Sequence, residues 1–181
     1  MSIDKDGVVL VYIFVIALIM LSGCLKVRSI SFIQNNFRKS IAGLYFSLLL
    51  GVTLCPIELP PQDSIYSLHQ LVNYIPFSDL KQDYINWMNV FGNIALFIPL
   101  IPLLKYCADN ISLTLKKSIY ISCVISLFIE FMQLFENITG LSGILGRQVD
   151  ITDIFYNTIG GIAGYFFWVL FQRICYSTPD E

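Results

Sequence analysis

The sequence predicts an all-α fold, a polytopic bundle of transmembrane helices with five spans. Of the 181 residues, 56% are hydrophobic and 13% are charged, about half the charged share of an ordinary soluble domain. The mean hydropathy is +0.70. Five apolar stretches each approach the ~20 residues that a transmembrane helix needs. So few charges cannot coat a water-facing surface, which argues against a soluble globular enzyme. The net charge of −2 gives no electrostatic basis for binding nucleic acid.

The five predicted spans are residues 8–25, 41–57, 88–104, 118–135 and 154–174. The first is free of charge, and Pro56 closes the second. The third contains Asn93 and Pro99, the fourth contains Glu130, and the fifth contains Asn157 near its start.

The long loop of residues 58–87 is too apolar for a simple solvated connection. Its apolar residues include Leu68, Leu71, Val72, Ile75 and Phe77. This composition is consistent with an interfacial or re-entrant segment.

The basic residues predict an orientation, because cytoplasmic loops are enriched in Lys and Arg. Eight of the eleven lie in the first and third connections or after the last span, and nine acids lie on the opposite side. We expect the N-terminus outside, the C-terminus inside and both longer polar loops outside. The four residues that end at Cys24 match a lipoprotein cleavage box. The positive n-region of a secretory signal is missing, however, so we favour a small-residue helix end there.

Polar residues within the spans point to a site. Charged groups in hydrocarbon are costly and tend to face the interior of a bundle. Glu130, Gln133 and Asn137 share one helix face, while Glu136 is expected off that face, in the headgroup region.

A second polar stripe leads into the last span. Arg147, Asp150, Asp153 and Asn157 follow one another at steps of 3, 3 and 4, which predicts that all four lie on one side of a helix. We expect Arg147 to pair with Glu130 or Asp150. Gly160, Gly161 and Gly164 follow on nearly the same face. The Gly-x-x-x-Gly spacing permits close approach of a neighbouring helix.

The predicted binding residues meet at the depth of the outer leaflet, where Asn73 and Asn93 also fall. They are Asn73, Asn93, Glu130, Gln133, Arg147, Asp150, Asp153 and Asn157.

Four motifs together resemble the VanZ-like family of bacterial membrane proteins. They are Val-Asn-Tyr-Ile-Pro-Phe at 72–77, Gly-Asn-Ile-Ala-Leu-Phe-Ile-Pro-Leu at 92–100, Ile-Glu-Phe-Met-Gln at 129–133, and Arg-Gln-Val-Asp-Ile-Thr-Asp at 147–153, continued by Asn157 and the three glycines. The chain departs from the family pattern at Ile101, where glycine is frequent. On this basis residues 1–39 are the first helix and its basic loop, 40–174 a VanZ-like membrane domain, and 175–181 a cytoplasmic tail.

The resemblance implies a multi-pass protein of the bacterial cytoplasmic membrane with a role in the cell envelope. The family's namesake is linked with resistance to the glycopeptide antibiotic teicoplanin. Membrane lipids and a lipid-linked envelope precursor or glycopeptide are the partners that this implies. We therefore expect the chain to bind or handle such a molecule at the outer leaflet.

Two alternatives remain open. An intramembrane enzyme could use Glu130, Asp150 or Asp153 on a lipid headgroup, but no nucleophile is marked, so we favour a role without catalysis. A scaffold or subunit of a membrane complex would need the polar residues only for packing. No cofactor is identified. His69 has no cysteine at ligand spacing, so no metal site is predicted, although carboxylate and amide oxygens could hold a divalent cation.

Overall fold

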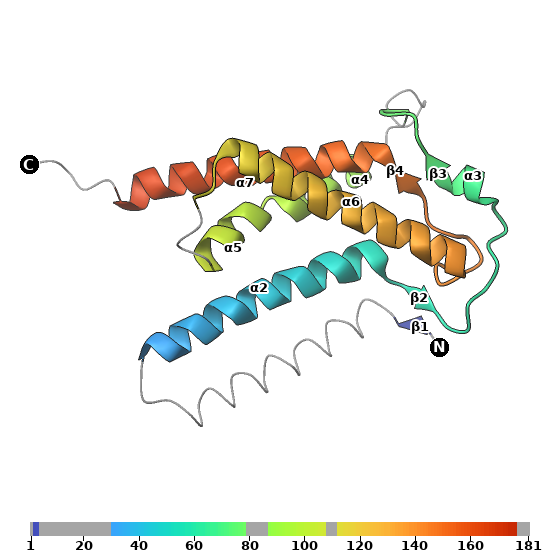
Figure 1. Ribbon diagram of the computed structural model, residues 1–181, viewed down its shortest axis with the longest axis horizontal. Coiled ribbons are helices and arrows are strands. Elements are labelled where there is room, and N and C mark those ends of the chain that lie inside the picture. The colour runs from blue at the N-terminus through green and yellow to red at the C-terminus, as the bar shows by residue number, and fades with distance from the viewer. Residues whose placement is uncertain (1, 4–29, 79–86, 108–111, 177–181) are drawn as a thin grey trace, which may run out of the picture. The chain divides into compact units, whose positions relative to one another are not determined.

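A computed structural model describes residues 2–3, 30–78, 87–107 and 112–176 of the chain, and these are mostly helical (Figure 1). The elements in chain order are β1 (Ser2–Ile3), α2 (Ile30–Leu54), β2 (Ile57–Glu58), α3 (Leu68–Leu71), β3 (Val72–Asn73), α4 (Trp87–Phe97), α5 (Leu100–Cys107), α6 (Leu115–Thr139), β4 (Val149–Asp150) and α7 (Ile151–Tyr176).

Four described segments are long and apolar enough to cross a membrane: Phe37–Leu54, Asn89–Cys107, Leu115–Thr139 and Ile151–Ile174. They correspond to the second to fifth predicted spans. The first predicted span, residues 8–25, lies outside the described residues, as does Cys24.

The outer faces of these helices carry large apolar side chains, as lipid-facing helices do. The side chains of Phe131, Phe166 and Leu170, for example, are 62%, 57% and 57% exposed. Hydrocarbon tails are a favourable environment for such faces, whereas contact with water would be costly. These helices make the chain a multi-pass membrane protein.

The third predicted span is interrupted. α4 ends at Phe97 and α5 begins at Leu100, with Ile98 and Pro99 in a turn between them. Proline lacks an N–H group and disfavours helical backbone at the residue before it, so Pro99 accounts for the break. The Leu103 N–H then donates to the Pro99 carbonyl at 3.0 Å and restarts the helix.

The chain divides into two compact units, and each is described by itself. The first unit comprises Met1–Asn73 and Ile129–Val149, and the second comprises Tyr74–Phe128 and Asp150–Glu181. The long helix α6 contributes to both units.

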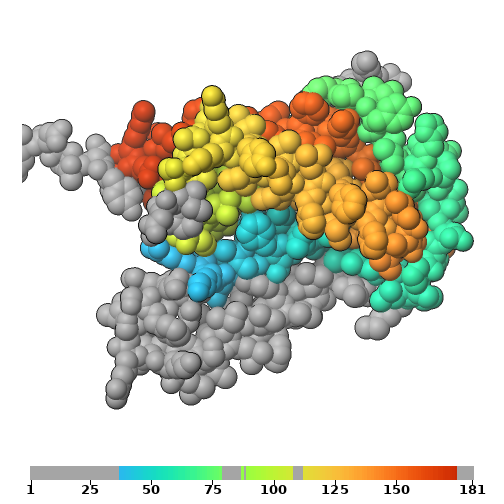
Figure 2. Space-filling view, in the orientation of Figure 1, coloured from blue at the N-terminus to red at the C-terminus, as the bar shows by residue number. Residues whose placement is uncertain are grey.

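In the first unit, the segment that follows α2 runs along the loop that follows α6. Three backbone hydrogen bonds join them, from the N–H groups of Glu58, Gln62 and Ile65 to the carbonyls of Leu141, Gly140 and Ile144, at 2.7–2.9 Å. Figure 2 shows the turquoise-to-green segment beside the orange end of α6. β1 pairs antiparallel with β2, and β3 pairs with β4.

The segment of residues 58–87 contains the single-turn helix α3 in its described part, residues 58–78. The Gln70 side chain accepts hydrogen bonds from the Ser67 N–H at 2.9 Å and from the Ser67 hydroxyl at 3.0 Å. Leu71 is buried, whereas Leu68 and Ile75 are exposed. An interfacial position for this segment stays a prediction.

In the second unit, α7 packs against α4 and α5. Phe97, Leu100 and Ile101 are fully buried around the helix break and form the centre of this unit.

Candidate functional site

The backbone of Arg147 is held in place by the side chain of Asn137. Its N–H donates to Asn137 Oδ1 at 2.8 Å, and its carbonyl accepts from Asn137 Nδ2 at 2.6 Å. A single amide side chain at the end of α6 therefore satisfies both backbone groups of Arg147. This fixes the point from which the long side chain extends.

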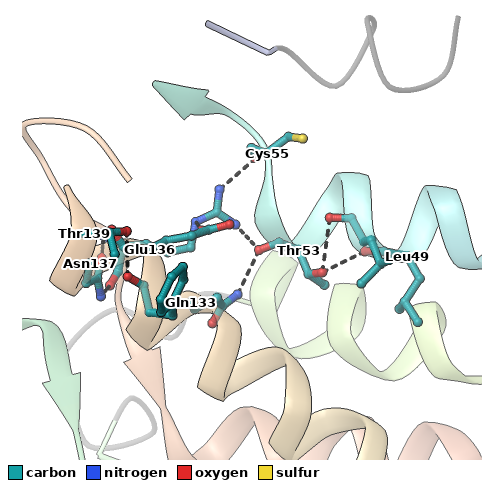
Figure 3. Close-up of polar contacts among 10 residues, drawn as sticks. Leu49, Thr53, Cys55, Gln133, Glu136, Asn137 and Thr139 are labelled. Atoms are coloured by element: carbon teal, nitrogen blue, oxygen red, sulfur yellow. Dashed lines mark hydrogen bonds and ion pairs between the residues drawn. The ribbon is translucent and has the colours of Figure 1, made fainter. Parts of the chain in front are cut away.

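The Arg147 guanidinium caps the C-terminal end of α2. Nη1 donates to the Thr53 carbonyl, and Nη2 donates to the Cys55 carbonyl at 2.7 Å. The last carbonyls of a helix have no partner within the helix and carry partial negative charge, so a cation is favourable there. Gln133 Nε2 donates to the same Thr53 carbonyl at 2.9 Å. Figure 3 shows Thr53, Cys55, Gln133 and Glu136 gathered in this cluster.

The carboxylate that Arg147 meets is that of Glu136, with 4.0 Å between Nε and Oε2. The prediction that Arg147 pairs with Glu130 or Asp150 is therefore wrong, and so is the place expected for Glu136 off the polar face, because Glu136 is 4% exposed and faces Arg147. The headgroup depth expected for Glu136 stays a prediction. Glu136 follows Gln133 by three residues, and this spacing puts it on the buried face of α6. We call Thr53, Cys55, Gln133, Glu136 and Arg147 the arginine cluster.

The loop between α6 and Arg147 depends on glycine. Gly140, Gly143 and Gly146 all have positive φ, of 72°, 77° and 66°. This backbone region strongly favours glycine. A Cβ at Gly143 would lie 2.5 Å from Glu58 Oε1, so the missing side chain also makes room for the Glu58 carboxylate.

A pocket of about 500 Å³ opens beside the arginine cluster. Its lining residues are Pro56, Glu58, Ser142, Ile144, Leu145, Gly146 and Arg147. Ile144 and Leu145 are 47% and 68% exposed. The pocket thus combines an apolar wall with a carboxylate, a hydroxyl and a guanidinium.

Among the described residues of the arginine cluster and the pocket, three buried polar atoms have no hydrogen-bond partner: Gln133 Oε1, Glu136 Oε2 and Ser142 Oγ. Buried polar atoms are normally hydrogen-bonded, so each of these atoms is a place where a water molecule, an ion or a ligand could bind. Ser142 is also part of the pocket lining.

The predicted stripe from Arg147 to Asn157 is not a single helical face. Residues 147–150 are non-helical and α7 begins at Ile151, so the prediction is wrong for Arg147 and Asp150. Asp150 stands just before the helix and accepts the Thr152 N–H at 2.7 Å. A carboxylate in this position satisfies an unpaired N–H of the first turn, which is how Asp ends a loop and starts a helix.

The other two members of that stripe, Asp153 and Asn157, lie on α7 in the second unit. Asn89 Nδ2 donates to Asp153 Oδ1 at 3.3 Å. Asn157 Nδ2 donates to Ser126 Oγ at 2.8 Å, and Asn157 is 3% exposed. Asn157 Oδ1 and Asn93 Nδ2 are buried without hydrogen-bond partners.

The three glycines of α7 lie at close helix contacts. A Cβ at Gly160 would collide with the Ile94 carbonyl, and one at Gly164 with the Ile98 carbonyl. A Cβ at Gly161 would collide with Ser122 Oγ of α6. This is the close approach that the Gly-x-x-x-Gly spacing predicts.

The eight predicted binding residues divide between the units. Asn73, Glu130, Gln133 and Arg147 belong to the first, and Asn93, Asp150, Asp153 and Asn157 belong to the second. Gln133 and Arg147 meet at the Thr53 carbonyl. Asn73 is half-buried in β3, and Glu130 is buried in α6 with 7% exposure. Among the described residues, no group of three His, Cys, Asp or Glu side chains could hold a metal ion.

Sequence reasoning missed Glu58, Ser142 and the two carbonyl acceptors. One local signal was present. Glycine at every third position from Gly140 to Gly146, directly before Arg147, indicates a tight turn that returns the chain to the end of α6. The partners on α2 leave no such signal, because they are backbone carbonyls.

A family model described as VanZ/LLP1 matches residues 42–172. No curated protein and no solved structure matches the chain. The matched region includes both units' polar residues and the three glycines of α7. The chain belongs to the VanZ/LLP1 family.

Proposed function

We propose that this protein binds or handles an amphiphilic envelope molecule at the outer leaflet and thereby contributes to teicoplanin-type resistance. An envelope lipid, a lipid-linked glycan and a glycopeptide antibiotic all fit this description. The observation that carries the proposal is the pocket beside the arginine cluster. Its apolar wall and its polar groups match a ligand with an apolar part and a polar head.

The charge pattern supports an outer position for the pocket. Arg38 and Lys39 lie in the first half of α2, and Lys116 and Lys117 lie in the first turn of α6. By the enrichment of basic residues in cytoplasmic loops, both helices begin inside and end outside. The pocket is built from the segments that follow these two helix ends. The outer leaflet is also where glycopeptide antibiotics reach lipid-linked envelope precursors.

Binding is supported over catalysis by the way the candidate carboxylates are used. Asp150 caps α7, and Asp153 accepts a hydrogen bond from Asn89. Glu130, the third candidate, is buried in α6 with 7% exposure. The contacts of Asp150 and Asp153 give these two carboxylates structural roles and leave the pocket's mixed lining as the feature that favours a ligand.

The test removes the apolar wall of the pocket and leaves the arginine cluster intact. The double variant Ile144→Asn/Leu145→Asn changes two exposed side chains, so we expect it to keep the fold. Tyr66→Asn/Leu68→Asn is the matched control, because both residues are exposed apolar side chains of the adjacent segment outside the pocket. Each form is expressed at equal membrane level in a teicoplanin-susceptible bacterium without a family member.

We expect the unaltered protein and the control to raise the minimal inhibitory concentration of teicoplanin, and the pocket variant to lose most of this increase. Purified protein in nanodiscs should bind teicoplanin or a lipid-linked wall precursor, and the pocket variant should not. The proposal fails if the pocket variant protects as well as the control and binds these probes equally.

A further inference from the structure

The charge of Arg147 is already balanced by its neighbours. Two of its three nitrogen atoms donate to the carbonyls of Thr53 and Cys55, and the third faces the buried Glu136 carboxylate. An additional anion in the pocket would approach Glu136 and Glu58 as well as Arg147. Like charges at short range are unfavourable, especially where burial reduces screening.

The charge of Glu58 is not balanced in this way. Its carboxylate lies against Gly143, in space that a side chain at position 143 would occupy. Within the ranges that the structure describes, the Glu58 side chain has no hydrogen bond or ion pair. The pocket therefore presents one negative charge that the protein itself does not neutralise.

Ser142 supplies a second acceptor in the same pocket. Its Oγ is buried without a hydrogen-bond partner, and a hydroxyl oxygen has lone pairs for an N–H donor. Ile144, Leu145 and Pro56 add an apolar wall to the same lining. A ligand that satisfies all three features carries a small cationic head with several N–H donors and an apolar body.

We propose that the pocket binds the primary ammonium group of an amphiphile, between the Glu58 carboxylate and the Ser142 hydroxyl. This inference rests on the proposed function and specifies the chemistry of the head group. An ammonium has three donors, which suits two carboxylate oxygens and one hydroxyl. Hydrogen bonds between ionised partners are about twice as strong as neutral ones. The apolar body of the ligand lies over Ile144 and Leu145.

Lipid binding measured by native mass spectrometry tests the head-group preference. The probes are phosphatidylethanolamine, phosphatidylcholine and phosphatidylglycerol with identical acyl chains. Phosphatidylcholine keeps the positive charge but has no N–H donor, and phosphatidylglycerol has no cation. We expect phosphatidylethanolamine to bind about tenfold more tightly than the other two, a ratio that one charge-assisted hydrogen bond supplies.

The variant Glu58→Gln should reduce phosphatidylethanolamine binding to the level of phosphatidylcholine. Asp63→Asn is the matched control, because it removes the same charge from an exposed residue of the same segment outside the pocket. Ser142→Ala is a second variant, expected to lose part of the preference. It keeps the test decisive if Glu58→Gln does not fold.

A second arm separates the two sources of an amine. A glycopeptide antibiotic is compared with the same compound acetylated on its amine, in nanodiscs of phosphatidylglycerol alone. Preference for the unmodified compound, lost in Glu58→Gln, assigns the pocket to the antibiotic. If the protein prefers phosphatidylethanolamine among the lipids but binds both antibiotic forms equally, the pocket is assigned to a lipid with a primary amine.

Equal binding of the three lipids and of both antibiotic forms by the unaltered protein overturns the inference, as does retention of the preference in Glu58→Gln. If Ile144→Asn/Leu145→Asn still abolishes binding and resistance in that case, the proposed function stands without the ammonium. If that variant changes neither, the proposed function fails as well.

Discussion

The two units bury polar side chains in different ways. In the first unit, the arginine cluster joins a cation, a carboxylate and two helix-end carbonyls beside a pocket. In the second, Asn157 and Ser126 form a neutral hydrogen bond next to glycines that bring helices into contact. Burial of a polar residue in a membrane helix is therefore not enough to identify a site. The contrast between charged and neutral partners predicts very different energetic costs when each is altered.

The largest effect is expected for Arg147→Ala. Removing the guanidinium leaves the Glu136 carboxylate buried without its partner and two helix-end carbonyls unsatisfied. The loss of a buried partner costs about 3–5 kcal/mol of unfolding free energy. The measurement is reversible unfolding in mixed micelles, followed by circular dichroism.

The double variant Arg147→Ala/Glu136→Gln is the control for this effect. Because it removes the stranded charge, we expect it to recover part of the lost stability. If Arg147→Ala lowers the unfolding free energy no more than an ordinary surface substitution does, the two units do not differ in the cost of altering their buried polar residues.

An intermediate effect is expected for Gly164→Ala in the second unit. The added Cβ collides with the Ile98 carbonyl at the break between α4 and α5. Overpacking of this kind costs about 1–3 kcal/mol. Thermal unfolding in detergent measures it.

Gly92→Ala is the matched control, since a Cβ at Gly92 has nothing within 4 Å. Alanine is better than glycine in a helix by roughly 0.5–1 kcal/mol, so this variant should be neutral or more stable. Equal effects at the two glycines would contradict close packing at Gly164.

The smallest effect is expected for the neutral hydrogen bond of the second unit. A double-mutant cycle with Asn157→Leu and Ser126→Ala should give a coupling energy of about 0.6 kcal/mol, the average for such pairs in membrane proteins. The same unfolding assay provides the four free energies. A coupling energy as large as the effect of Arg147→Ala would remove the distinction between the two units.

The helices were predictable because their signals are local. The apolar stretches at 41–57, 118–135 and 154–174 match α2, α6 and α7, although each helix extends beyond its predicted start. Pro99 in the third span is evident from the sequence. The sequence does not show whether this proline kinks the span or divides it into α4 and α5. The close approach at Gly160 and Gly164 follows from a spacing of four residues, which is also local.

The arginine cluster was only partly predictable. Arg147 and Gln133 stand out as polar residues near span ends, but their common acceptor is a backbone carbonyl that no side-chain pattern marks. The spacing of 3, 3 and 4 residues from Arg147 to Asn157 is typical of a helix, but α7 begins only at Ile151. Three left-handed glycines reverse the chain before Arg147, and this tertiary turn decides that Glu136 is its partner.

The sequence distance across the arginine cluster has a consequence for biosynthesis. Arg147 follows its acceptors Cys55 and Thr53 by 92 and 94 residues. Because a chain emerges from the ribosome N-terminus first, α2 is made long before the residue that caps it. The end of α2 therefore stays uncapped by Arg147 until α4, α5 and α6 have been synthesised. In a product that stops short of Arg147, this end of α2 would never receive its guanidinium cap.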